Sequence, residues 1–157
     1  MSVVVRESLP GDAEELGSVL SPSDRLEAWL ATGRPPEEAL IRSAEQSCLC
    51  WSIVLDGQLA AMAGAGSAGY PGLGVPWLLS TTRIADRSLG VARKLVWCRD
   101  RILEVFPRLV NFVYAGNPTA VGLVKGLGFT VADRPEPYGW CGAPFYRFQM
   151  EVENVLG

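Results

Sequence analysis

The stretch from Asn117 to Phe129 reads NPTAVGLVKGLGF and does most to decide the fold. Asn117 is a favoured residue for capping the start of a helix, and Pro118 fits the first helical turn, where its missing N–H is not needed. Gly128 is typical of the residue at which a helix stops, and Phe129 opens a short run with strand character. The stretch predicts a short helix placed directly before a strand, and capping alone explains these residues without any ligand.

Length and composition narrow the classes of protein. We expect one domain over residues 1–157, which is long enough to bury a sizeable core. A net charge of −3 argues against nucleic-acid binding, because phosphate affinity needs clustered Lys and Arg. The chain has no His, and its four Cys form no CxxC pair. A Ser-His-Asp triad is therefore excluded, and we predict no metal site.

One long uncharged stretch bears on whether the chain enters a membrane. No charged residue occurs from Gly57 to Thr82, which is long enough to cross a bilayer. Five Gly between Gly64 and Gly74, together with Pro71 and Pro76, interrupt it. We therefore expect two buried strands joined by a Gly-rich loop, with no membrane span and no secretion signal.

The order of elements predicts an α/β protein. Asp56-Gly57 predicts a hairpin, and the apolar periodicity of residues 87–106 predicts a long helix that connects two parallel strands. A mixed central sheet of about seven strands, flanked by helices, is the expected architecture. The expected strands cover residues 3–5, 48–55, 58–66, 77–79, 109–115, 129–132 and 145–152, with a loop over 133–144 and helices that begin near residues 10, 21, 35, 87 and 117.

The start of the long helix is a candidate phosphate site. Residues 87–92 read RSLGVA, and a helix N-terminus offers free N–H groups and the positive end of its dipole to an anion. Gly90 allows a close approach to the backbone, and Arg83 and Arg87 add positive charge. A plain amphipathic helix start explains the same residues equally well, so both interpretations stand.

The two segments together resemble motifs of the GNAT superfamily of N-acyltransferases. One motif is a pyrophosphate loop of the form Arg/Gln-x-x-Gly-x-Gly/Ala, and the other is a later helix with Asn, Ala and Gly-Phe at fixed spacing. The resemblance covers nearly the whole chain and implies the GNAT fold, with acetyl-CoA or CoA as cofactor. The matching positions are Arg87, Gly90, Ala92, Asn117, Ala120, Gly128 and Phe129.

This resemblance also implies where the cofactor lies. The acyl-pantetheine arm is expected between the strand around Trp77 and the strand at 109–115, and the pyrophosphate on the start of the long helix. The residues implied in cofactor binding are Trp77, Leu78, Leu79, Arg87, Ser88, Leu89, Gly90, Val91, Ala92, Arg93, Asn117 and Ala120. The acceptor is expected to be a small amine or a protein amino group.

The proton-transfer groups are harder to assign. Acyl transfer to an amine needs a base for the amine proton and gains from an acid that protonates the departing thiolate. The superfamily often carries a proton-donating Tyr at the position of Val124, and the strand at 77–82 has no carboxylate. We predict Tyr114 and Tyr138 as the catalytic residues, with Glu136 as a further substitute and proton loss through water as the alternative.

Further segments resemble a family of small GNAT-fold phage proteins related to the internal virion protein A of short-tailed phages. They comprise residues 24–29, 33–40, 74–79, 109–111 and 145–148, together with Trp51. This implies a phage origin, a location in the host cytoplasm or the virion, and a second copy of the chain or another virion or host protein as partner. The alternative function is a non-catalytic GNAT-fold protein, virion-associated or binding a host factor, that retains CoA binding.

Two residues of the long helix need partners. Arg99 falls on its apolar face, and we expect a carboxylate or backbone carbonyls to pair with it. Trp97 lies on the opposite face, where it either stacks on Arg93 and Arg101 or marks a self-association patch.

Overall fold

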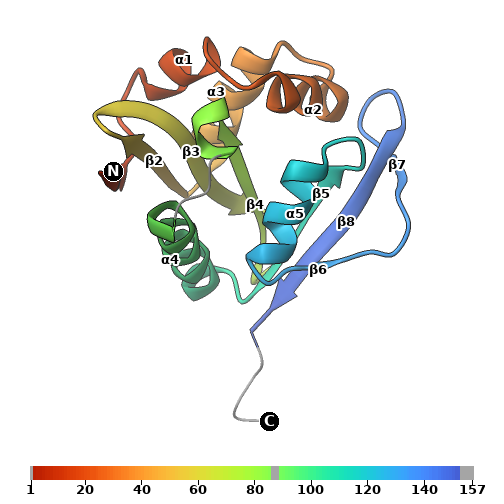
Figure 1. The fold of residues 1–157 in the computed structure, drawn as a ribbon. Coiled ribbons are helices and arrows are strands. Elements are labelled where there is room, and N and C mark those ends of the chain that lie inside the picture. The colour runs from red at the N-terminus through yellow and green to blue at the C-terminus, as the bar shows by residue number, and fades with distance from the viewer. Residues whose placement is uncertain (1, 86–88, 153–157) are drawn as a thin grey trace.

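A computed structural model describes residues 2–85 and 89–152 and shows one mixed sheet with helices on both faces (Figure 1). Within these residues the strand order is β1-β2-β3-β4-β5-β8-β6, with β7 paired to β8 beside this path. The strands are β1 Val3–Glu7, β2 Leu49–Leu55, β3 Gln58–Ser67, β4 Leu73–Ser80, β5 Arg108–Tyr114, β6 Thr130–Val131, β7 Glu136–Tyr138 and β8 Ala143–Glu151. The helices are α1 Asp12–Gly17, α2 Pro22–Thr32, α3 Pro36–Gln46, α4 Leu89–Val105 and α5 Pro118–Gly126, with a short 3-10 turn over Thr82–Ala85.

The predicted α/β architecture is confirmed. β2 and β3 form the expected hairpin, in which Asp56 and Gly57 both have positive φ, 48° and 81°. β4 and β5 are parallel, and α4 makes the crossover between them. The short helix at residues 118–126 also begins and ends where its caps predict, since Asn117 accepts a hydrogen bond from the backbone N–H of Ala120.

Two strands differ from the sequence prediction. β4 begins at Leu73, whereas the Gly and Pro residues before Trp77 predicted a loop there. Residues 136–138 form β7 within the expected loop and pair with the start of β8. In both places a Pro lies in an extended strand. Pro is tolerated in a strand where its nitrogen faces no hydrogen-bonding partner on a neighbouring strand.

The helices divide between the two faces of the sheet (Figure 1). α1 and α3 pack on one face, where Leu16, Leu40 and Met62 are buried together. α4 packs on the other, where Val91 and Leu95 contact the buried strand residues. The sheet is therefore covered by helices on both sides.

A buried carboxylate fixes α1 to the sheet. The Asp12 side chain accepts hydrogen bonds from Arg6 at 2.7 Å, from the Leu9 backbone N–H at 2.8 Å and from the Ser52 hydroxyl at 2.7 Å. The Arg6 guanidinium contributes most to holding the pKa of Asp12 down, at about 2. Asp12 thus joins β1, α1 and β2.

The β7–β8 turn docks onto the C-terminal end of α2. The Trp140 indole N–H donates to the Trp29 carbonyl at 2.9 Å, and the two rings meet edge to face with centroids 5.3 Å apart. Gly139 has a φ of 78°, and a Cβ there would collide with the Leu30 carbonyl. This contact holds α2 in place across the sheet.

Replacing Asp12 by Asn is expected to lower the free energy of unfolding by about 2 kcal/mol at pH 7, the typical value of hydrogen bonds to a charged group. The pKa of Asp12 is lower in the folded chain than in the unfolded chain. Its contribution is therefore present above about pH 4 and lost as the pH falls toward 2. Urea unfolding at several pH values measures this.

The exposed Glu14→Gln variant on the same helix is the control, and it should unfold like the wild type. A difference between the Asp12→Asn variant and the wild type that persists unchanged at pH 2 would contradict the assignment.

Candidate functional site

The strands β4 and β5 separate soon after they meet. Their paired residues are Leu73 with Arg108 and Gly74 with Leu109. Beyond these pairs lies Pro76, whose carbonyl accepts a hydrogen bond from the Asn111 side chain at 2.7 Å. In a strand the nitrogen and carbonyl of one residue face the same side, so the nitrogen of Pro76 also faces β5 and has no hydrogen to donate. The ladder therefore ends here and a gap opens.

Side chains take over the hydrogen bonds that the ladder lacks. The Asn111 side-chain oxygen accepts from the Phe112 backbone N–H at 2.8 Å. Glu27 Oε1 accepts from the Tyr114 backbone N–H at 2.7 Å, although these residues are 87 positions apart. Asp24 Oδ2 accepts from the backbone N–H and the hydroxyl of Ser80 at 2.8 and 3.1 Å. The two carboxylates that reach the gap, Asp24 and Glu27, therefore both come from α2.

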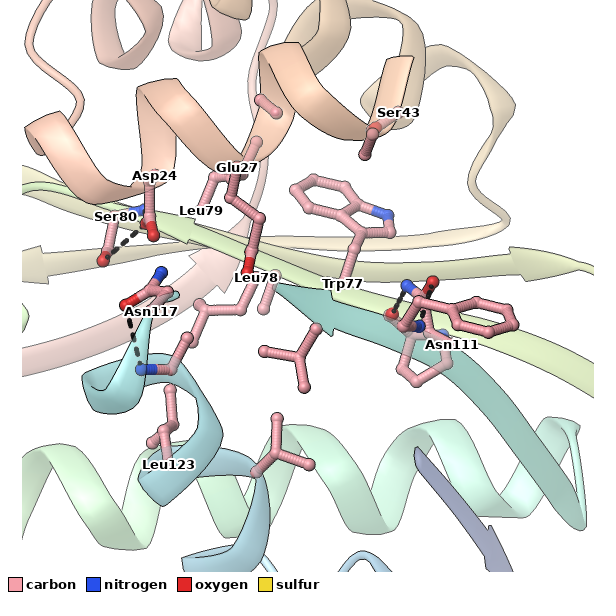
Figure 2. A pocket seen from close by; sticks show the side chains of 18 of the residues that line it. Asp24, Glu27, Ser43, Trp77, Leu78, Leu79, Ser80, Asn111, Asn117 and Leu123 are labelled. Carbon is pink, nitrogen blue, oxygen red and sulfur yellow. Dashed lines mark hydrogen bonds between the residues drawn. The ribbon is translucent and has the colours of Figure 1, made fainter. Parts of the chain in front are cut away.

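A cavity of about 620 Å³ passes through this gap and reaches both faces of the sheet. Its walls come from α2 and α3 on one face, from α4 and α5 on the other, and from β4 and β5 between them (Figure 2). Most of the lining side chains are apolar. Among the described residues, the charged groups on its walls are Asp24, Glu27 and Arg99.

Local sequence explains why both carboxylates of α2 reach the cavity. The Ser21 hydroxyl caps α2 by accepting from the Asp24 backbone N–H at 3.2 Å, and the Ser21 N–H donates to the Ser80 carbonyl at 2.9 Å. The helix start is thereby tied to the end of β4. Asp24 and Glu27 are three residues apart and share one face, and Figure 2 shows both pointing from α2 toward Asn117.

The environment changes the ionisation of both carboxyl groups. Burial raises the pKa of Glu27 to about 7, the nearby Asp24 charge adds to the increase, and the Tyr114 N–H opposes it. Burial also raises the pKa of Asp24, and the hydrogen bonds from Ser80 oppose that increase. Glu27 is therefore close to half-protonated at neutral pH, which is the condition for a group that accepts and releases protons.

Asn117 brings an unsatisfied donor to the same place. Its side chain is 4% exposed, and Oδ1 accepts from the Ala120 N–H at 3.3 Å. Its Nδ2 is buried and has no hydrogen-bond partner among the described residues. The amide lowers the pKa of both Asp24 and Glu27, so its N–H groups face the two carboxylates. A buried donor without a partner is unfavourable unless a ligand or water satisfies it.

The cavity brings together six of the fourteen site residues predicted from sequence. Five of the residues implied in cofactor binding and one predicted catalytic residue line it. They are Trp77, Leu78, Leu79, Asn117, Ala120 and Tyr138.

The two predicted catalytic tyrosines occupy different environments. The Tyr138 ring stacks on Phe112 with centroids 4.1 Å apart, and burial raises its pKa, so its hydroxyl keeps its proton at neutral pH. The Tyr114 ring lies against Phe145 and over Gly116, and it is not among the described cavity-lining residues. Tyr114 contributes its backbone N–H to the site through Glu27. Glu136 is exposed on β7.

The start of α4 lies apart from this cavity. Gly90 and Arg93 border a second hollow of about 650 Å³, together with Lys94 and Trp97 of α4 and two residues of β1. Val91 is buried in the core, and Ala92 is half-buried. The remaining predicted positions there, Arg87, Ser88 and the Leu89 side chain, lie outside the described part of the chain.

The two other residues singled out on the long helix have partners. Arg99 donates to the Leu127 carbonyl at 2.7 Å and pairs with Asp100 at 2.9 Å, as expected for a structural arginine, although it also lines the cavity. Trp97 is 43% exposed, and the Arg101 guanidinium lies 5.5 Å from its ring centroid. The predicted stacking on Arg101 is confirmed.

The two carboxylates of α2 were missed by the sequence analysis. Ser21 and Asp24 form an ordinary helix-capping pattern, which explains an acidic residue in the first turn without any site. The one sequence signal for an acidic site is the second carboxylate, Glu27, which lies three residues after Asp24 and on the same helix face. Only the fold shows that this face meets the gap.

The fold is that of the GNAT superfamily. A putative acetyltransferase from Acinetobacter baylyi is similar over 99% of this chain and 95% of its own, with a TM-score of 0.74 and 17% identity. A spermidine N-acetyltransferase from Vibrio cholerae, solved with CoA and spermine, is similar over 99% and 98%, with a TM-score of 0.71 and 13% identity. A phosphinothricin acetyltransferase from Sinorhizobium meliloti, solved with acetyl-CoA, is similar over 100% and 92%, with a TM-score of 0.69 and 14% identity.

At these identities the similarity establishes the fold. No family model matches the sequence, and no curated protein sequence matches it. Within residues 2–85 and 89–152, no helix is long and apolar enough to cross a membrane. The same residues contain no group of three or more His, Cys, Asp or Glu side chains placed to hold a metal ion.

Replacing Glu27 by Gln is expected to stabilise the protein increasingly as the pH rises from about 4.5 to above 7. The pKa of Glu27 is higher in the folded chain, so folding favours the protonated form and is opposed once the group ionises. The full shift corresponds to on the order of 3 kcal/mol, and Gln keeps an oxygen for the Tyr114 N–H.

Urea unfolding of both proteins between pH 4 and 8 measures this, with Glu45→Gln, an exposed position on α3, as the control. Parallel stability curves for the wild type and Glu27→Gln would rule out a buried carboxyl group with a raised pKa.

Proposed function

We propose that the protein is an N-acyltransferase that transfers the acetyl group of acetyl-CoA to an amine. The observation that carries this proposal is the position of Glu27. Its carboxyl group, with a pKa of about 7, lies in the gap between β4 and β5 of a GNAT fold. Direct transfer to an amine needs a base of this kind at neutral pH.

The gap fits the acyl-pantetheine arm of the cofactor. The alternation of backbone groups along β4 places the N–H and carbonyl of Leu78 on the same side as the Pro76 carbonyl and the Ser80 N–H, away from β3. These groups of Leu78 face the gap beyond the last β4–β5 pair, where an extended chain with amide groups would pair with them. Asn117 Nδ2 supplies a further donor.

The rest of the cofactor has a proposed place at the start of α4. Leu89 is the first described residue of that helix, and residues 87–92 carry the resemblance to a pyrophosphate loop. The positive end of a helix dipole suits a pyrophosphate. When bound, acetyl-CoA supplies an acyl group activated as a thioester, whose C–S bond breaks as the amide C–N bond forms.

The chain itself supplies the proton transfers. The Tyr114 N–H holds Glu27 Oε1, which leaves Oε2 to accept a proton from the amine and pass it to water. We propose that Tyr138 is the acid, because its hydroxyl stays protonated and its side chain lines the cavity. Tyr114 remains the second candidate from the sequence.

The alternative is a GNAT-fold protein that binds CoA without catalysing transfer. Val124 favours it, because this residue lines the cavity where the resemblance places a proton-donating Tyr. The sequence segments that resemble phage proteins support a phage origin and a virion or host partner for either function. Turnover of acetyl-CoA in the presence of an amine distinguishes the acyltransferase from the non-catalytic protein.

Calorimetric titration with acetyl-CoA, followed by an assay of thiol release with a panel of primary amines, tests the proposal. We expect binding of acetyl-CoA and transfer to at least one amine. The Glu27→Gln variant should bind acetyl-CoA normally but lose about 10²–10⁴-fold in kcat/KM, the usual contribution of a general base. In the wild type, kcat/KM should rise with pH through about 7 as Glu27 ionises.

Glu45→Gln is the matched control and should keep both properties. Binding of acetyl-CoA without turnover of any amine would support the non-catalytic alternative. If acetyl-CoA does not bind at all, both the acyltransferase and the CoA-binding alternative are wrong.

The Tyr138→Phe and Tyr114→Phe variants distinguish the two candidate acids. We expect the larger loss of kcat for Tyr138→Phe, roughly 10²-fold or more, because its hydroxyl is the one at the cavity. KM for acetyl-CoA should change little in either variant. A larger loss in Tyr114→Phe would reverse the assignment.

A further inference from the structure

The α2 side of the cavity carries negative charge that no cation among residues 2–85 and 89–152 neutralises. The nearest basic residue on α2, Arg25, donates to the Gly17 carbonyl and pairs with Glu37 at 2.6 Å. Neither Asp24 nor Glu27 forms an ion pair within the described residues. A cation supplied by a ligand would therefore gain more here than at an exposed surface, because the carboxylates are desolvated.

Each carboxylate keeps one oxygen free for such a ligand. Asp24 uses Oδ2 for both of its bonds to Ser80, and Glu27 uses Oε1 for its bond to Tyr114. An ammonium group has three N–H donors and no acceptor, so it suits two free carboxylate oxygens.

An independent observation points to a ligand at the same place. Asn117 lines the cavity and is only 4% exposed, and its Nδ2 has no hydrogen-bond partner among the described residues. This donor faces Asp24 and Glu27 in Figure 2. Asn117 Nδ2 forms no hydrogen bond with either carboxylate in the structure, and a bound acyl group would offer its carbonyl oxygen as an acceptor.

The surrounding wall sets the character of the rest of the ligand. Next to the carboxylates the cavity is lined by Ala28, Ala31, Trp77, Phe112 and Tyr138, which offer apolar and aromatic surface and no positive charge. Arg99 lies on the α4 side and is engaged by Asp100 and Leu127. An acidic group beside α2 would meet two carboxylates and, among the described residues, no unpaired cation.

We propose that the acceptor is a small primary amine whose only charge is its ammonium group, carried on an uncharged apolar or aromatic body, and that Asp24 is a specificity-determining residue. This inference rests on the proposed function and names the substrate class of the same site. Amino acids are rejected, because their carboxylate lies two bonds beyond the amine nitrogen and would face Asp24 and Glu27. Repulsion between like charges in such a site costs several kcal/mol.

Matched pairs of amines test the proposal on the wild-type protein. Phenethylamine and tyramine differ from phenylalanine and tyrosine only in lacking the carboxylate. With saturating acetyl-CoA, we expect kcat/KM for each amine to exceed that of its amino acid by about 100-fold or more, because charge repulsion weakens the binding of the amino acid.

The Asp24→Asn variant removes one charge and keeps the shape. We expect it to narrow the preference for phenethylamine over phenylalanine by about tenfold, while Glu45→Gln keeps the wild-type ratio. A ratio unchanged by Asp24→Asn would show that Asp24 does not set specificity. Equal kcat/KM values within the pairs would overturn the acceptor class while leaving the acyltransferase intact.

Calorimetry of the same pairs in the presence of CoA reads the selectivity without turnover. Binding of phenethylamine and tyramine but not of the amino acids supports the proposed ligand class even if no acetyl group is transferred. The lack of acetyl transfer would separately contradict the proposed enzymatic activity. Equal binding within each pair, or binding of neither member, would refute it.

Discussion

The site depends on one missing hydrogen: the backbone N–H that Pro76 lacks on the side of β4 that faces β5. Two parallel strands that begin in register would otherwise continue their ladder, and the sheet would be closed at its centre. Because the nitrogen of Pro76 cannot donate, and its carbonyl is bound by the Asn111 side chain, the strands separate beyond Gly74. The cavity, its lining and its access to both faces of the sheet all follow from this separation.

Opening a sheet exposes backbone groups that must find other partners. The protein satisfies them with side chains, and two of those side chains are carboxylates from α2. Glu27 and Asp24 therefore replace ladder bonds and at the same time place negative charge inside the fold. Glu27 opposes folding when it ionises, so the same desolvation that raises its pKa makes it a weak point in stability and a suitable base.

The sequence predicted what local rules determine. The caps of α5, the turn at Asp56-Gly57 and the apolar face of α4 depend on neighbouring residues, and the order of these elements indicated the fold. The strand start at Leu73 was missed, because Gly and Pro normally interrupt strands and only the open side of β4 tolerates Pro76. Glu27 was missed because its partner, the N–H of Tyr114, lies 87 residues away and no local pattern reveals such a contact.

The docking of the β7–β8 turn on α2 also has a consequence for biosynthesis. α2 is translated well before the turn that docks on it, because the carbonyl of Trp29 accepts its hydrogen bond from Trp140, which is 111 residues later. A nascent chain that stops before the β7–β8 hairpin has the bonds from Ser80 and Tyr114 to the carboxylates of α2, but the C-terminal end of α2 lacks its contact with Trp140. The acidic pocket is thus completed only when the β7–β8 hairpin has formed, because this hairpin supplies Tyr138 to the wall and Trp140 to the end of α2.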